Sequence, residues 1–156
     1  QKIVEAQSGI LWFAMYPNLF VAFVIYLIAG CAETNRAPFD LPEAESELTA
    51  GFHTEYSGFG FGLFAVAEYG NLFVMASIAT IMFLGGWNGP FGLGSGPILG
   101  AFWFMLKVFV LMLVMMWVRW TYPRVRFDQL MNLAWKYLIP FSLVNLLITA
   151  FLVKMI

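Results

Sequence analysis

The sequence predicts an all-α fold, a polytopic bundle of four transmembrane helices with a long charged cytoplasmic loop that contains a short helix. Hydrophobic residues make up 62% of the 156 residues and charged residues only 11%, and the mean hydropathy is +0.81. A soluble domain usually carries about 25% charged residues. This chain has too few polar side chains to cover a soluble surface, so the bilayer must act as its solvent.

The placement of charge divides the chain into spans. Three long stretches contain no Lys, Arg, Asp or Glu, namely 6–32, 69–106 and 137–153. A membrane-spanning helix needs roughly 20 apolar residues, each rising about 1.5 Å. We therefore predict one membrane domain over residues 1–156, with four spans at 10–32, 61–84, 98–118 and 137–155.

The first span is too long for the apolar part of a signal peptide, and no Ala-x-Ala-type cleavage site follows it. The chain begins at Gln1 rather than Met, so we expect a longer parent protein with upstream segments. Cys31 is the single cysteine, which excludes an internal disulfide. At the end of an apolar run it is expected to be a small buried thiol.

The connections between spans predict the orientation. The connection 119–136 contains Arg119, Arg124, Arg126 and Lys136, whereas the glycine-rich connection 85–97 contains no Lys or Arg. Positive charge favours the cytoplasmic side. We therefore expect 33–60 and 119–136 to be cytoplasmic, and 85–97 and the C-terminus to lie outside. The glycines of 85–97 follow no strand and lack a Lys-Ser/Thr pair, so we interpret them as turn residues and not as a phosphate-binding loop.

The loop 33–60 contains six of the nine acidic residues. Asp40 followed by Glu43, with Pro42 between them, predicts an N-cap, a capping box and a short helix. Glu43 and Glu47 then lie on one helix face, where like charges repel and raise the pKa of neighbouring carboxyl groups. A solvated surface loop is the simpler interpretation, but it does not account for this internal order.

Two charged residues lie inside predicted spans. A charge near the bilayer centre costs roughly 2.5–3.5 kcal/mol, so Glu68 is expected to be protonated or to face an interior path, with Asn71 on the same face. A proton relay is favoured over structural pairing within the bundle. Lys107 could counter Glu68 or line a hydrated axis, and both remain open.

Other polar residues carry weaker signals. Ser142, Asn145 and Thr149 share one face of the last span, which favours helix-to-helix contact over a substrate path. His53 is the single histidine, and one His with one Cys cannot support haem or iron–sulfur electron transfer. We therefore predict no metal site and no catalytic residue here, and expect a partner to bring the electrons in any redox reaction.

Several motifs, in order and spacing, resemble one known family. They are Ala32–Leu48 (AETNRAPFDLPEAESEL), Gly51–Gly58 (GFHTEYSG), Ala67–Tyr69 (AEY), Gly85–Trp87 (GGW) and Pro123–Met131 (PRVRFDQLM). Together they resemble the H subunits of bacterial NADH:quinone oxidoreductase, respiratory complex I. The resemblance covers essentially the whole chain and implies the C-terminal part of such a protein, with its last four transmembrane helices.

The resemblance also implies a role. Such a subunit belongs to an enzyme, a translocase of the bacterial inner membrane, but is itself non-redox. It walls part of the quinone tunnel and couples quinone reduction to proton translocation. The candidates for the quinone-coupling loop are Arg36, Asp40, Glu43, Glu45, Glu47 and Glu55. Glu33 and Glu68 match acidic positions of the proton path, and we add Lys107 because of its place in a span.

Quinone is then the substrate, whereas NADH, FMN and iron–sulfur clusters belong to partner subunits of the peripheral arm. Small membrane-arm subunits are further expected partners. This chain lacks the upstream helices of the family, so alone it is not expected to be catalytic. Three alternatives remain: the homologous subunit of a membrane-bound hydrogenase-type complex, a free-standing ion transporter, and a structural anchor. A transporter often shows an inverted repeat, and none is visible here. An anchor leaves Glu68 and the acidic loop unexplained.

Overall fold

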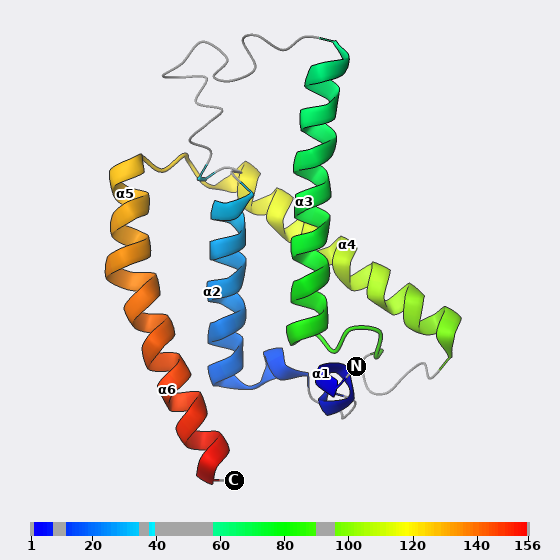
Figure 1. Ribbon diagram of the computed structural model, residues 1–156, viewed down its shortest axis with the longest axis vertical. Coiled ribbons are helices and arrows are strands. Elements are labelled where there is room, and N and C mark those ends of the chain that lie inside the picture. The colour runs from blue at the N-terminus through cyan, green and yellow to red at the C-terminus, as the bar shows by residue number, and fades with distance from the viewer. Residues whose placement is uncertain (1, 8–11, 35–37, 40–57, 90–95, 156) are drawn as a thin grey trace.

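The computed structural model describes residues 2–7, 12–34, 38–39, 58–89 and 96–155, and every regular element within these ranges is helical (Figure 1). In chain order the elements are α1 (Lys2–Ala6), the 3-10 helix η1 (Phe13–Met15), α2 (Pro17–Glu33), α3 (Phe59–Phe83), α4 (Pro97–Thr121), α5 (Phe127–Asn132), the π-helical turn η4 (Leu133–Leu138) and α6 (Ile139–Met155). The predicted all-α fold class is confirmed.

Three of the described helical segments are long and apolar enough to cross a membrane, namely Phe59–Phe83, Pro97–Thr121 and Phe127–Leu152. α2 is also apolar but has only 17 residues. Large apolar side chains cover the outside of these helices, including Phe102, Trp117 and Phe151. Such a surface requires lipid or other membrane helices around it, so the chain is a multi-pass membrane protein.

The first long helix begins at Pro17, later than the predicted start at residue 10. Proline lacks an N–H and fits only the first turn of a helix, and Pro17 is the first residue of α2. Trp12 before it has extended backbone, and η1 turns the chain into the helix. The prediction extended the apolar stretch across a proline that marks a helix start.

α3 begins two residues before the predicted span 61–84 and ends one residue before its end, whereas α4 extends beyond the predicted span 98–118 at both ends. α4 also begins with a proline, Pro97, and ends at Thr121, two residues before Pro123. Proline disfavours helical backbone in the residue that precedes it, here Tyr122. α3 ends at Phe83, and Gly85 and Gly86 just after it have φ of 72° and 55°, left-handed values that glycine adopts without strain.

The C-terminal helical rod begins at Phe127, ten residues before the predicted span 137–155. Its middle is the π-helical turn η4, where the N–H of Ile139 donates to the carbonyl of Ala134. Pro140 has no N–H for Lys136, and its ring would clash with that carbonyl in a regular helix. The wider π turn relieves this conflict. The helix therefore runs past Lys136, the charged residue just before the predicted start of the last span.

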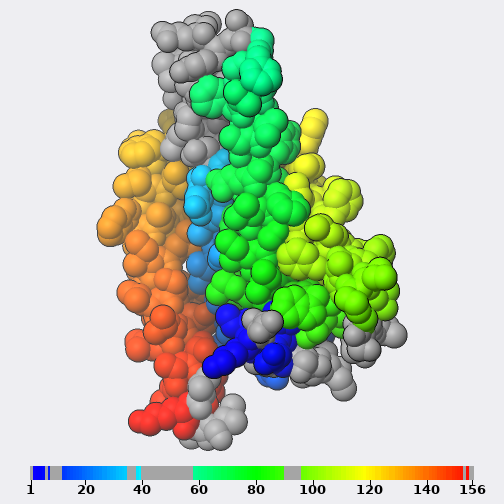
Figure 2. All heavy atoms as spheres, turned by 45° about the vertical axis from the view of Figure 1, so that its right-hand side comes forward, coloured from blue at the N-terminus to red at the C-terminus, as the bar shows by residue number. Residues whose placement is uncertain are grey.

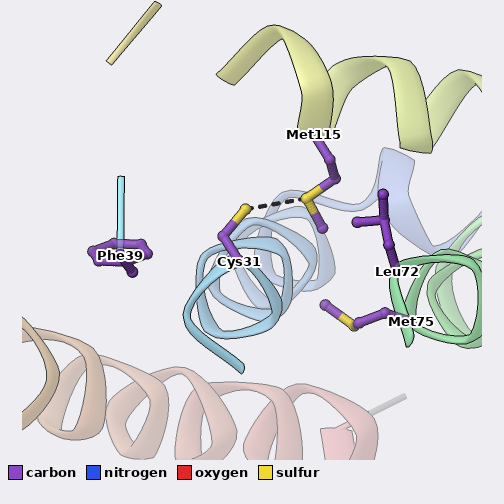
Figure 3. Close-up of a cluster of buried hydrophobic side chains, with 5 residues drawn as sticks. All are labelled: Cys31, Phe39, Leu72, Met75 and Met115. Atoms are coloured by element: carbon purple, nitrogen blue, oxygen red, sulfur yellow. Dashed lines mark hydrogen bonds between the residues drawn. The ribbon is translucent and has the colours of Figure 1, made fainter. Parts of the chain in front are cut away.

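α2 lies between α6 and α3, and α4 crosses both α2 and α3 obliquely (Figure 1). Asn18 of α2 donates a 3.3 Å hydrogen bond to the hydroxyl of Thr149 on α6, which agrees with the interpretation of the polar stripe as helix-to-helix contact. Two buried clusters hold the bundle together. The first comprises Cys31, Phe39, Leu72, Met75 and Met115 (Figure 3), and the second Ala76, Ala79, Val108 and Leu111.

Candidate functional site

The acidic loop begins at the C-terminal end of α2. Thr34 is the C-cap residue of the helix, and its hydroxyl donates to the carbonyl of Gly30 at 2.9 Å. Glu33 just before it is exposed. Farther along, the N–H of Val125 donates to the carbonyl of Pro38 at 2.9 Å. This bond joins the segments 33–60 and 119–136 at one end of the molecule. They were predicted to share one side of the membrane.

Most of the predicted coupling loop lies outside the described residues. This applies to the predicted short helix that begins after Asp40 and to the single histidine, His53. It also applies to the loop candidates Arg36, Asp40, Glu43, Glu45, Glu47 and Glu55. Their roles stay predictions, and the geometry of the site rests on Glu33, Glu68, Lys107 and their neighbours.

Phe39 anchors the beginning of that loop on the bundle. Its ring is buried in the cluster with Cys31 and Met115 (Figure 3), whose sulfur atoms lie 3.1 Å apart. An apolar cavity of about 540 Å³ opens beside it between α2, α4 and the start of α5. Its lining includes Ile28, Cys31, Phe39, Val118, Tyr122 and Leu133. Because Phe39 packs in one cluster with Cys31 of α2 and Met115 of α4, a movement of Phe39 would displace side chains of both helices.

One of the contacts between α2 and α3 is a hydrogen bond from a residue inside the apolar span. The hydroxyl of Tyr26 donates a 3.3 Å hydrogen bond to the carbonyl of Met75. The two helices run antiparallel (Figure 1). Glu33 follows Tyr26 by seven residues, and Glu68 precedes Met75 by seven. Seven residues are close to two turns and about 10 Å, so each carboxyl group lies about two turns from this contact, towards the end of the bundle where the acidic loop begins.

Glu68 is half-buried on α3, and Asn71 one turn on is exposed. Lys107, on α4, reaches the opposite end of α3, where its ammonium donates to the carbonyl of Leu84 at 2.6 Å. Sixteen residues separate Glu68 from Leu84, about 24 Å along a helix. Glu33 and Glu68 thus lie towards one end of the bundle and Lys107 lies at the other, which excludes a direct Glu68–Lys107 ion pair.

Sequence analysis did not single out Tyr26, Gln7 or Trp12. Tyr26 carries a hydroxyl inside an apolar span, where such a group needs a partner, and it stands two turns from Glu33. That spacing was visible in the sequence. The importance of Gln7 and Trp12 was not, because their partners are about 70 to 100 residues away along the chain.

The described part of the chain contains no group of three or more His, Cys, Asp or Glu that could hold a metal ion. The chemistry that this part offers is proton exchange at carboxyl groups, with Glu33 exposed at the end of α2 and Glu68 half-buried on α3. A carboxyl group within a membrane protein serves ion or proton paths more often than other purposes.

Comparison with known proteins identifies the family of this chain. Residues 1–150 match the family described as NADH dehydrogenase. The chain is 51% identical to the H subunit of NADH-quinone oxidoreductase from Desulfotalea psychrophila, over 98% of this chain and 47% of that protein. The H subunit from Bacteroides thetaiotaomicron is 53% identical over 96% of the chain and 44% of its own length. That from Paramagnetospirillum magneticum is 54% identical over 95% and 42%.

The chain therefore spans less than half the length of these curated relatives, and it matches their C-terminal part. The family match covers nearly the whole chain, and the identities are far above the level at which unrelated sequences align. The chain belongs to the NADH dehydrogenase family.

Proposed function

We propose that this chain is the C-terminal part of the membrane-embedded H subunit of a bacterial NADH:quinone oxidoreductase. In this role it forms part of the quinone-binding tunnel and couples quinone reduction to proton translocation, without catalysing electron transfer itself. The observation that carries the proposal is the half-buried carboxyl group of Glu68 on α3, the helix next to α2, whose end holds Glu33 and the start of the acidic loop. The relatives of this chain are named as H subunits of NADH-quinone oxidoreductase, which supports the choice of enzyme complex.

The loop is proposed to sense the chemistry of the partner subunits. NADH-derived electrons arrive through FMN and iron–sulfur clusters of the peripheral arm, and reduction of quinone to quinol consumes protons together with electrons. Negative charge that develops near the loop raises the pKa of its carboxyl groups and favours proton uptake. The residues proposed for this part are Arg36, Asp40, Glu43, Glu45, Glu47 and Glu55.

From the loop, protons are proposed to pass by way of Glu33 and Glu68 into the neighbouring subunits of the membrane arm. Glu33 lies at the end of α2 where the loop begins, and Glu68 lies half-buried on the neighbouring helix α3. Ordered water can bridge carboxyl groups that do not touch. Lys107 is too far from this pair to exchange protons with it directly.

Replacement of the two carboxyl groups in the full complex tests the proposal. Glu68→Gln and Glu33→Gln remove a titratable proton while keeping side-chain size. We expect both variants to lower the number of protons pumped per quinone reduced, measured in proteoliposomes. Glu5→Gln, an exposed glutamate at the other end of the bundle, is the matched control. Unchanged coupling in Glu68→Gln would remove this residue from the path.

The alternatives give different outcomes. If mild detergent extraction recovers hydrogenase-type peripheral subunits with this chain, the electron donor is not NADH. If the purified chain alone carries protons or sodium into liposomes, it is a free-standing transporter. If neutralisation of the loop carboxyl groups leaves pumping unchanged, the chain is a structural anchor.

A further inference from the structure

The end of the bundle opposite the acidic loop contains a buried cation. Lys107 of α4 has only 6% of its surface exposed. Its ammonium donates hydrogen bonds to the carbonyls of Leu84, Gly86 and Asn88 at 2.6, 3.1 and 2.5 Å. An ammonium group has three N–H donors, so its hydrogen-bonding capacity is met by protein alone.

Leu84 is the C-cap residue of α3, and Gly86 and Asn88 belong to the connector that follows it. The carbonyls at the end of a helix lack partners within it and form the negative end of the helix dipole. A cation that binds the Leu84 carbonyl is stabilised by both effects. Lys107 also lies 4.2 Å from the ring centre of Trp12, within the range of a cation–π interaction. Its charge is thereby held in one position by groups from three segments of the chain.

Gln7 completes the closure of this end. Its side chain is fully buried, and its amide nitrogen donates to the carbonyls of Ile81 and Met82 at 3.2 and 3.1 Å. Its amide oxygen accepts from the N–H of Gly85 at 2.9 Å. Asn88 in turn donates to the carbonyl of Val4 at 3.1 Å. Figure 2 shows α1, in dark blue, packed against this end of α3.

The packing around these bonds is close. A Cβ atom added to Gly85 would lie 2.9 Å from Cδ1 of Trp12, and one added to Gly86 would lie 2.9 Å from a methyl carbon of Val4. Since real Cβ atoms are almost never found at such distances, the two glycines let the connector lie closer to Trp12 and Val4 than any other residue type would allow.

Solvent nevertheless comes near. A cavity of about 730 Å³ opens between the connector and α4, and it is lined by Trp87, Asn88, Gly100 and Phe104, among others. Asn88 therefore borders this cavity and at the same time presents its carbonyl to Lys107. Ile81 of α3 also lines the cavity, so the cavity lies against α3 and against the connector whose carbonyls bind Lys107.

We propose that Lys107, held by Trp12 and the connector Leu84–Asn88, is a fixed cation that bars protons from crossing the subunit along its long axis at this end. A buried positive charge next to a hydrated cavity repels hydronium, as positive groups do in pores that exclude protons. Gln7 and Trp12 are positioning residues in this barrier. With this end closed, protons carried by Glu68 leave into neighbouring subunits across the long axis and not along it. This inference rests on the proposed function of Glu68.

Passive proton permeability of the full complex in proteoliposomes, without NADH, tests the barrier. A potassium diffusion potential drives proton influx, and a trapped pH dye reports it. Lys107→Met removes the charge and its hydrogen bonds, and we expect severalfold faster influx. Lys107→Arg keeps a cation with hydrogen-bond donors, and we expect influx close to wild type. Lys154→Met is the control, an exposed lysine on α6 at the same end.

Trp12→Leu keeps Lys107 and provides a second variant if Lys107→Met fails to assemble; it should raise influx less than Lys107→Met would. Uncoupled quinone reduction is measured alongside and should stay near wild type. A lower melting temperature with unchanged influx in both variants would overturn the barrier and leave a purely structural role. The test is independent of the Glu68 experiment, because that experiment measures pumping during turnover and this one measures leak at rest.

Discussion

The hydroxyl of Tyr26 donates a hydrogen bond of 3.3 Å to the main-chain carbonyl of Met75. α2 and α3 are antiparallel, so Glu33, seven residues after Tyr26, and Glu68, seven residues before Met75, both lie on the same side of this bond. Two carboxyl groups far apart in the sequence thus lie towards the end of the bundle where the acidic loop begins. The same residue pair offers a direct test of the helix register.

Tyr26→Phe is expected to lower the free energy of unfolding by about 1 kcal/mol, the usual contribution of a hydrogen bond. The ring keeps its packing against Phe83, whose centre lies 5.8 Å away. Thermal unfolding of the purified chain in detergent measures the change. Tyr137→Phe, an exposed tyrosine in η4, should leave stability unchanged. Equal effects of the two substitutions would contradict the assigned register.

The contact between α2 and α6 predicts energetic coupling between Asn18 and Thr149, whose side chains are 3.3 Å apart. In a double-mutant cycle with Asn18→Leu and Thr149→Val, we expect a coupling free energy of about 0.6 kcal/mol, typical of hydrogen bonds between membrane helices. Unfolding in detergent provides the measurement. Additive effects of the two substitutions would show that the polar stripe serves another purpose.

Two glycines of α3 and its connector should respond to alanine in opposite directions. Gly86 has φ of 55°, and a Cβ there would meet Val4, so Gly86→Ala should destabilise the chain by at least the roughly 1–2 kcal/mol that left-handed backbone costs other residues. Gly70 lies within α3 with nothing near its Cβ position, so Gly70→Ala should stabilise the helix by roughly 0.5–1 kcal/mol. Melting temperatures of both variants provide the test.

Cysteine labelling tests the proposed orientation in the bacterial inner membrane. In a Cys31→Ala background, Asp128→Cys should react with a membrane-impermeant thiol reagent from the cytoplasmic side, and Lys154→Cys from the outer side. Both positions are exposed. The unmodified chain is the control, since Cys31 is buried and should label slowly from either side. The reverse pattern would invert the topology.

The sequence by itself determined the fold class, the number of apolar segments, the position of the charged loop and the family. Each of these depends on local composition or on the order of motifs, which a linear chain displays directly. The predicted starts of the first and last helices differ from the structure, and the residues responsible lie close to those starts in the sequence. Pro17 marks a helix start and Pro140 permits a π turn, and both could have been taken into account.

Only the tertiary structure decided which polar groups meet. A uniformly apolar helix contains little information about its rotation or height relative to its neighbours, because every face is compatible with lipid. The pairs Tyr26–Met75, Gln7–Ile81 and Lys107–Leu84 therefore depend on contacts between distant parts of the chain. For Lys107 the structure excluded one of the two open interpretations, the pairing with Glu68: its ammonium binds carbonyls at and just beyond the end of α3, because buried donors must find acceptors and those carbonyls lie within reach.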